Sequence, residues 1–392
     1  MSVRFRKWIS VAVFAAILLC GCSGQDTDLI PPTFESVPPA DRSDPMRERV
    51  LKRCEEIHGL YAEMEKPAGE DSRSAVDAIE TLLMEAGLDV VDTDAVYPDY
   101  LTTADRFRDF WVTRQEPAEQ EVITIRESGA LAYTLFSCQE DGVYTYIMHY
   151  PPEEGEEPYF EQHEVLDWAL TDRGSFYYQL YPAGDKHYSD YTLLRLNPPD
   201  RELFDLNLKY IRAGGYTGTN LFLTDWSEDD FGALSFNDLW EYLYYDCYGQ
   251  HFSPEGYKFM PERECYQIPA AEFEAVVLPY FEIALDAFRD LAHYDEAGNF
   301  YPWRPIQTND YSFLGFYDIE PEVISGQANP DGTVTLQVWM LSTDLKTDCL
   351  FSHEVTVRPL DDGRFQFVGN RITSRTEYGL PYCEPRLTWE KP

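Results

Sequence analysis

The stretch VITIRESGALAYTLFSCQEDGVYTYIMH, residues 122–149, decides the fold class that this sequence predicts. Three of its segments alternate apolar and polar residues, which is typical of strands that bury one face. These segments are Val122–Arg126, Leu131–Cys138 and Val143–His149. Links containing Ser128-Gly129 and Asp141-Gly142 separate them, and links this short suit hairpins rather than crossover helices. We therefore expect an antiparallel meander.

The alternating pattern continues downstream, whereas the pattern upstream is helical. Three further strands are expected at Val165–Thr171, Phe176–Tyr181 and Tyr191–Leu196, which makes the meander six-stranded. Upstream, apolar residues recur every three or four positions, as on amphipathic helices. We expect these helices to begin near Ser43-Asp44-Pro45 and near Ser72 and to include Thr103–Arg114, with a short strand at Leu88–Val91.

The C-terminal half mixes helices with a second set of strands. Helices are expected at Asp200–Arg212 and after a capping Ser235 with Asp238 at the capping-box position. A further helical pair is expected at Pro269–Val277 and Pro279–Ala292. Four alternating strands follow, at Glu322–Ala328, Thr333–Leu341, Phe351–Arg358 and Phe365–Arg371. This order of elements over residues 265–375 resembles a cystatin-like or nuclear-transport-factor-like α+β cone.

The sequence thus predicts an α+β protein with a helical N-terminal section, a central antiparallel meander sheet and a C-terminal domain of helices plus antiparallel sheet. A leader and a Pro-rich segment precede these parts. The expected divisions are a signal peptide at 1–21, a tether at 22–45, a helical section at 46–118, an antiparallel sheet with helices at 119–262, and a C-terminal α+β domain at 263–392.

The N-terminus has the three parts of a secretory signal. Basic residues precede the apolar run Val11–Leu19, which is too short to span a membrane as a helix. Leu19-Cys20-Gly21-Cys22 then resembles a bacterial lipobox, in which Cys22 would follow the cleavage site and carry a diacylglyceryl group. Cys20 does not fit, because Leu19 would occupy a position that requires a small side chain. The alternatives are ordinary secretion with cleavage nearby and a retained short anchor.

The charge of the chain excludes several classes of partner. The formal net charge is −39, and removal of the three basic residues in the leader would bring it to −42. Recognition of phosphates requires a basic face, so we expect no nucleic-acid partner. The same charge disfavours adsorption to anionic lipid, so membrane contact would depend on the lipid anchor. We expect an anchored position on the extracytoplasmic face of the cell membrane.

Six cysteines remain after Cys20 is removed with the leader and Cys22 is lipidated. An even number in an exported chain permits disulfides. Cys247–Cys265 is the first pair we expect, because a short Pro-containing segment links them. Plain core thiols are the alternative, above all for Cys54 on its apolar helix stripe. The six are Cys54, Cys138, Cys247, Cys265, Cys349 and Cys383.

The sequence contains no recognised catalytic or cofactor motif. It lacks a nucleophile elbow, a phosphate-binding glycine loop, a C-x-x-C pair and an H-E-x-x-H helix. Ser352-His353-Glu354 combines the residue types of a catalytic triad, but neighbours on a strand point to opposite faces and do not converge. The histidines lack ligand spacing on an expected helix. We name no catalytic residue and expect no metal and no cofactor.

The segment Tyr294–Tyr317 is rich in aromatic residues and contains prolines. If exposed, such rings could stack on sugar rings or hold an apolar peptide. The alternative is that the rings pack the segment onto the final sheet. The candidate ligand-binding residues are Tyr301, Trp303, Tyr311 and Phe313.

The lipobox, the Pro-rich tether and the C-terminal strands together carry one resemblance. With NPDGTVTLQVWM (329–340) and FSHEVTVRPLDDGRFQFVGN (351–370), they resemble uncharacterised lipoproteins of Gram-positive bacteria, which form a family of unknown function. The resemblance implies no activity and no catalytic residue.

Two functional hypotheses follow from these observations. The first is a membrane-anchored extracytoplasmic lipoprotein with a non-catalytic binding or envelope-assembly role, whose partner would be an envelope glycan or protein. The alternative is a cell-envelope hydrolase that uses a carboxylate pair. With 70 acidic residues in the chain, the sequence does not identify such a pair.

Overall fold

The computed structural model describes residues 45–64, 72–94, 96–113, 118–151, 157–182, 191–306, 319–375 and 384–387. The described residues all belong to one compact unit, Arg42–Pro392. The predicted leader, Cys22 and nearly all of the predicted tether lie outside these ranges. Within the described ranges, no helix is long and apolar enough to cross a membrane. The predicted α+β class is confirmed.

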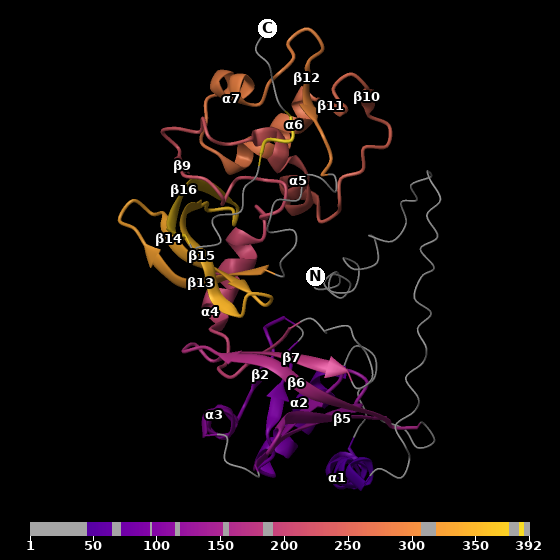
Figure 1. Cartoon of the computed structure of the whole chain (residues 1–392). Coiled ribbons are helices and arrows are strands. Elements are labelled where there is room, and N and C mark those ends of the chain that lie inside the picture. The colour runs from indigo at the N-terminus through magenta and orange to yellow at the C-terminus, as the bar shows by residue number, and fades with distance from the viewer. Residues whose placement is uncertain are drawn as a thin grey trace. The chain divides into compact units, whose positions relative to one another are not determined.

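Eight strands of the described chain close into a barrel, whose strands lie in the purple to magenta part of the chain in Figure 1. They are β1 (Val90–Asp92), β2 (Tyr100–Leu101), β3 (Ala118–Ile125), β4 (Leu131–Gln139), β5 (Gly142–Tyr150), β6 (Tyr159–Leu170), β7 (Ser175–Pro182) and β8 (Thr192–Arg195). Strands β3 to β8 pair in sequence order and antiparallel, as the predicted meander requires. Closure was not predicted: β1 pairs parallel with β3, and β2 pairs parallel with β8.

The N-terminal helices pack on the barrel strands and do not form a core of their own. These helices are α1 (Pro45–Tyr61), α2 (Ser72–Glu85) and α3 (Ala104–Thr113). Ile123 of β3 shares a hydrophobic cluster with α1 and α2, whereas its neighbour Val122 shares a different cluster with α3. This split follows from the alternation of side chains between the two faces of a strand. The predicted division at residues 118/119 therefore separates helices from the strands that bury them.

The C-terminal half contains two smaller sheets. One has the order β13-β14-β15-β16-β9 and the other has the order β10-β11-β12. Their strands are β9 (Trp226–Ser227), β10 (Lys258–Met260), β11 (Cys265–Pro269), β12 (Phe300–Trp303), β13 (Ile319–Ala328), β14 (Val334–Ser342), β15 (Thr347–Pro359) and β16 (Phe365–Arg375). Strands β13 to β16 confirm the four C-terminal strands that the sequence predicts. Strand β13 lies at one edge of its sheet.

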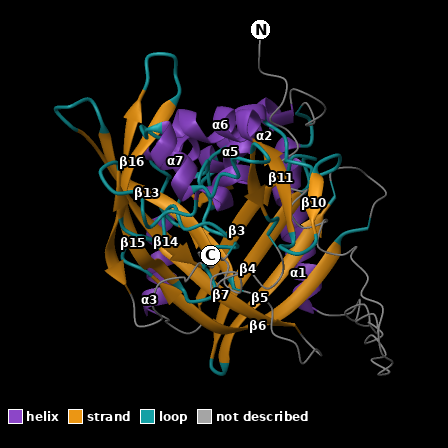
Figure 2. Ribbon diagram, turned by 90° about the horizontal axis from the view of Figure 1, so that it is seen from above, coloured by secondary structure: helices purple, strands orange, loops and turns teal. Residues whose placement is uncertain are grey.

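Short helices connect these strands, and α5, α6 and α7 group near one another in Figure 2. The helical elements are α4 (Arg201–Leu206), a π-helical turn (Asn207–Ile211), a 3-10 turn (Phe236–Leu239), α5 (Trp240–Tyr248), α6 (Ala270–Val277), a 3-10 turn (Leu278–Tyr280) and α7 (Leu285–Leu291). The predicted capping box at Ser235 is wrong. Ser235 makes no side-chain cap hydrogen bond, and the carboxylate of Asp238 instead accepts hydrogen bonds from Arg386.

One hydrophobic cluster joins the helices of the C-terminal half to its strands. It extends from Tyr210 to Phe367 and contains Trp240, Phe273 and Val355, all fully buried. The predicted division at residues 262/263 therefore falls inside a single core. The likeness to cystatin-like or nuclear-transport-factor-like folds stays a prediction.

Candidate functional site

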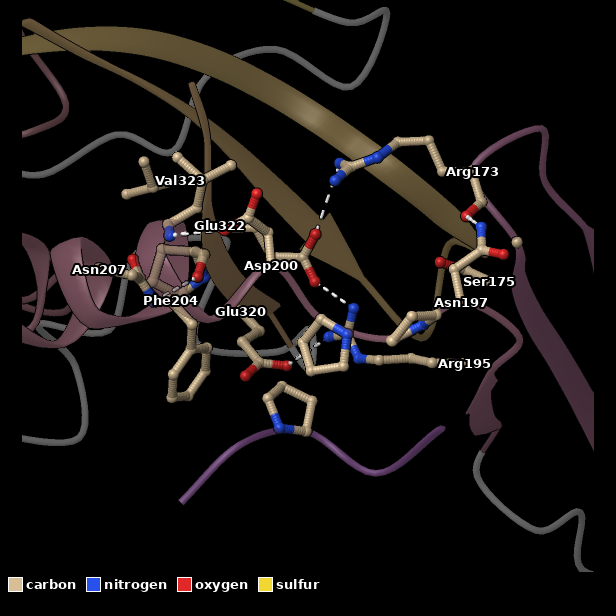
Figure 3. A pocket seen from close by; sticks show the side chains of 16 residues that line it. Arg173, Ser175, Arg195, Asn197, Asp200, Phe204, Asn207, Glu320, Glu322 and Val323 are labelled. Atoms are coloured by element: carbon tan, nitrogen blue, oxygen red, sulfur yellow. Dashed lines mark hydrogen bonds and ion pairs between the residues drawn. The ribbon is translucent and has the colours of Figure 1, made fainter. Parts of the chain in front are cut away.

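A cavity of about 310 Å³ lies where the barrel and the C-terminal sheet meet (Figure 3). Its lining residues come from five places in the chain: the connection between β1 and β2, the β6–β7 turn, the end of β8 with the segment after it, the first turns of α4 and its π-helical extension, and the start of β13. This volume lies at the lower end of the range of roughly 300–1,000 Å³ that is usual for small-molecule sites. We take this pocket as the candidate functional site.

The β6–β7 turn brings Arg173 to the pocket. Gly174 N–H donates to the Thr171 carbonyl oxygen at 3.0 Å, and Ser175 N–H donates to the Thr171 hydroxyl at 3.1 Å. Gly174 has φ +89°, a conformation that L side chains rarely adopt. The side-chain amide of Asn197 donates to the Arg173 carbonyl oxygen at 2.5 Å and so ties this turn to the segment after β8.

The Gly174→Ala substitution is expected to lower the free energy of unfolding by about 2 kcal/mol. An added Cβ would meet the Asn197 side-chain nitrogen at 2.6 Å, in addition to the backbone strain at positive φ. Urea denaturation measures this loss. Gly363→Ala is the matched control, because Gly363 has φ +88° but open space where its Cβ would be. Equal losses in the two variants would contradict the proposed contact.

The segment Asn197-Pro198-Pro199-Asp200 leads from β8 into α4 and forms part of the pocket wall. Proline fixes its own φ and biases the preceding residue toward extended conformations, so this connection is short and stiff. Asp200 then caps α4, since its side chain accepts a hydrogen bond from Leu203 N–H at 3.1 Å. The same residues therefore end the barrel, start the next helix and line the pocket.

Asn207 opens the π-helical turn that follows α4 and also lines the pocket. Its side-chain amide donates to the Pro321 carbonyl oxygen at 2.9 Å. Its Oδ1 atom is buried and has no hydrogen-bond partner among the described residues. Turns of π-helix occur frequently at functional sites, and a buried acceptor without a donor costs free energy. Both observations single out Asn207 within the pocket.

Two arginines of the barrel meet two glutamates of β13 at the pocket. Figure 3 shows Arg173 and Arg195 pointing toward the carboxylate of Glu322. Arg195 pairs with Glu322 and, at 3.3 Å, with Glu320, while Arg173 pairs with Glu322 at 3.4 Å. Burial opposes the charge of Arg195, but the two carboxylates outweigh it and raise its pKa. Arg195 is therefore a permanent cation that joins the two sheets.

Two of the predicted ligand-binding aromatics are core residues, so that prediction is wrong for them. Tyr301 is 0% exposed and Trp303 is 3% exposed. The Tyr301 hydroxyl donates to Glu274 at 2.8 Å, and the Trp303 indole donates to Glu241 at 2.9 Å. Both belong to β12, which pairs with β11 and buries its side chains instead of forming an open loop. The other two candidates, Tyr311 and Phe313, lie outside the described residues.

The expected Cys247–Cys265 disulfide is absent, because both thiols are free. The Cys247 sulfur lies 3.6 Å from the Tyr280 hydroxyl, whereas Cys265 packs with Met260 and Phe300 in a separate small cluster. Cys247 lies near the end of α5, and Cys265 begins β11 after the intervening β10, so the two side chains are directed to different places. Cys54 is fully buried on α1, in accord with the alternative of a core thiol.

The side chains of Ser352, His353 and Glu354 do not converge, as predicted from their positions on one strand. Ser352 hydrogen-bonds to Thr373, and Glu354 pairs with Arg371. His353 is fully buried and lies between the Tyr216 hydroxyl at 2.7 Å and the Asn370 side-chain oxygen at 2.6 Å. In the described part of the chain, no group of three or more His, Cys, Asp or Glu side chains could hold a metal ion.

Sequence reasoning did not identify the pocket residues. The double proline after a strand and ahead of a helix is the one local signal that could have pointed to the pocket.

Comparisons with known proteins identify the family of the chain. No curated protein and no solved structure matches the chain. Residues 44–386 match the family of unknown function DUF6070, and because this match covers most of the sequence, the chain belongs to that family.

Proposed function

We propose that this protein is a lipid-anchored, extracytoplasmic lipoprotein of the Gram-positive type, whose folded part binds a small ligand in the pocket without transforming it. The lipobox around Cys22 supports the anchor, and the acidic composition supports a body that stands away from its own membrane. The family match covers the folded part and carries no activity with it.

The cavity itself is the observation that carries the binding role. It is large enough for a small molecule, and its wall combines charged side chains with Asn207 of the π-helical turn. A hydrolase would instead require one carboxyl group free to act as an acid and another free to act as a base or nucleophile. In this pocket, Glu320 and Glu322 both pair with Arg195, and Glu322 also pairs with Arg173.

The Cys22→Ala substitution is expected to move the protein from the membrane fraction to the aqueous fraction. The thiol of Cys22 is the attachment point in the lipobox reading, and the described residues contain no helix that could replace the anchor. Immunoblots of separated membrane and aqueous fractions measure the change. Cys20→Ala is the matched control and should stay with the membrane. Retention of the Cys22→Ala variant at the membrane would contradict the anchor.

The binding role is tested on the full chain purified in detergent. Native mass spectrometry should detect a bound small molecule, or thermal unfolding in a metabolite library should show one that raises the midpoint. Asn207→Leu, which removes the acceptor and the contact to Pro321, should abolish that signal. If no compound gives a signal in either experiment, the proposed binding function is wrong.

A further inference from the structure

We propose that the pocket takes an uncharged polyhydroxyl ligand, a neutral sugar of one or two rings. This inference rests on the proposed function, in which the pocket is a binding site, and it names the class of ligand. Three features of the wall carry it: charges that are already matched within the protein, a donor placed beside an acceptor, and an apolar side built from an aromatic ring and prolines.

The charged side chains of the wall oppose one another. Arg195 contacts Glu322 and, at 3.3 Å, Glu320, and Arg173 contacts Glu322 at 3.4 Å. The remaining charged lining residue, Asp200, accepts a hydrogen bond from the first turn of α4 as its cap. A charged group of a ligand would have to separate one of these ion pairs, and breaking a partly buried pair is costly. The wall therefore favours a ligand without charge.

The paired ions still offer hydrogen bonds to a ligand. A guanidinium has more N–H donors, and a carboxylate more lone pairs, than the contacts at Arg173 and Glu322 use. The Arg173 side chain is 40% exposed, and its guanidinium lies 5.0 Å from the ring centroid of Trp339, which supports it from one side. Figure 3 shows this guanidinium pointing toward the Glu322 carboxylate, so the pocket presents a donor directly beside an acceptor.

Adjacent hydroxyl groups match a donor beside an acceptor. A hydroxyl both donates and accepts a hydrogen bond, so one hydroxyl of a sugar can accept from Arg173 while its neighbour donates to Glu322. Neither bond requires the ion pair to separate, and hydrogen bonds to charged groups are the stronger kind. An ammonium group has donors only and a carboxylate has acceptors only, so each would bond to one member of the pair and be repelled by the other.

Phe204 supplies an apolar surface for the CH groups of a sugar ring. Its ring lines the cavity and lies 5.4 Å from the ring of Tyr97, which in turn lies 4.6 Å from the Arg201 guanidinium, so neighbours hold it in place. A volume of about 310 Å³ suits one or two sugar rings. Four prolines line the same cavity and add CH surface without N–H donors: Pro98, Pro198, Pro199 and Pro321.

The test uses the full chain in a detergent whose head group contains no sugar. The neutral probes are glucose, galactose, mannose, N-acetylglucosamine and their disaccharides, and the charged probes are glucosamine, glucuronic acid and galacturonic acid. N-acetylalanine amide serves as a neutral probe without hydroxyl groups. Isothermal titration calorimetry should show that the best neutral sugar binds at least tenfold more tightly than the charged probes and the amide. Equal affinities across the three kinds of probe, or no binding by any neutral sugar, would overturn the inference.

Variants connect the binding to the pocket. Phe204→Leu keeps an apolar side chain but removes the ring, and Arg173→Met removes the donors, so each should weaken the best sugar at least tenfold. The matched controls are Phe259→Leu and Arg371→Met, because Phe259 is 45% exposed, the Arg371 side chain is 68% exposed, and neither lines the pocket. If the pocket variants and the controls bind the sugar equally well, the sugar binds elsewhere and the inference is wrong. Circular dichroism confirms that each variant is folded.

The failure of this inference is distinguishable from the failure of the proposed function. If a library compound that is not a sugar binds and Phe204→Leu or Arg173→Met weakens its binding, the pocket is a binding site but the sugar assignment is wrong. If neither sugars nor library compounds bind, both are wrong.

Discussion

Replacing Arg386 by Met should lower the free energy of unfolding by about 3–5 kcal/mol. Arg386 is 5% exposed, and its guanidinium contacts Asp238 at 3.1 Å and Glu241 at 3.0 Å. Burial is the largest influence on both carboxyl groups and raises their pKa values, although Arg386 opposes it. Without the arginine, two buried carboxylates would lose their counter-ion, which costs far more than a missing surface pair.

Urea denaturation at neutral pH measures this loss, and a matched variant separates it from the general effect of removing an arginine. Arg364→Met removes a 63% exposed guanidinium that pairs with Asp362, and it should change the unfolding free energy by less than about 1 kcal/mol. Part of the Arg386→Met loss should return on acidification, because protonation removes the uncompensated charges. An Arg386→Met loss no larger than that of Arg364→Met would contradict the role of the buried cluster.

Acidification from pH 6.5 to pH 4 should lower the unfolding free energy by roughly 3 kcal/mol through His353 alone. Burial lowers the pKa of His353 to about 4, from an ordinary value near 6.5. In this window the unfolded chain binds a proton and the folded chain does not. The contribution is therefore fully present above about pH 6.5 and is lost as the pH falls toward 4.

Comparison of the wild type with His353→Gln isolates this contribution from the many carboxylates. The difference between the two unfolding free energies should change with pH across the window, with the wild type losing more stability on acidification. Near-UV circular dichroism verifies that both proteins start from a folded state at each pH. Parallel stability curves for the two proteins would show that His353 does not titrate as its burial requires.

His353 also shows how much of the structure a local sequence pattern can predict. Alternation along β15 predicted correctly that the side chains of Ser352, His353 and Glu354 do not converge. It did not reveal that His353 is fully buried between Tyr216 and Asn370. Tyr216 is 137 positions away along the chain, so no local period records that contact.

The errors have the same origin. Tyr301 and Trp303 were ligand-binding candidates on the condition that their proline-containing segment exposes its rings, yet pairing of β12 with β11 buries them. Cys247 and Cys265 are near each other in sequence, but the fold places the Cys247 thiol beside the Tyr280 hydroxyl and the Cys265 thiol in the small cluster with Met260 and Phe300. The residue types and their distances along the chain are the same whether the rings are exposed or buried and whether the thiols are paired or free. Composition therefore does not distinguish these outcomes.

The sequence by itself determined the α+β class, the meander, the C-terminal strands and most helix positions. These depend on periodicity and turn residues, which act over a few positions. The tertiary structure decided the closure of the barrel through the two-residue strand β2, which is too short to carry a period. It also decided the pocket, since Arg195 and Glu322 are 127 positions apart and come together only when two sheets pack. Charge pairing across such distances depends on three-dimensional proximity, and for that reason the candidate site emerged from the fold.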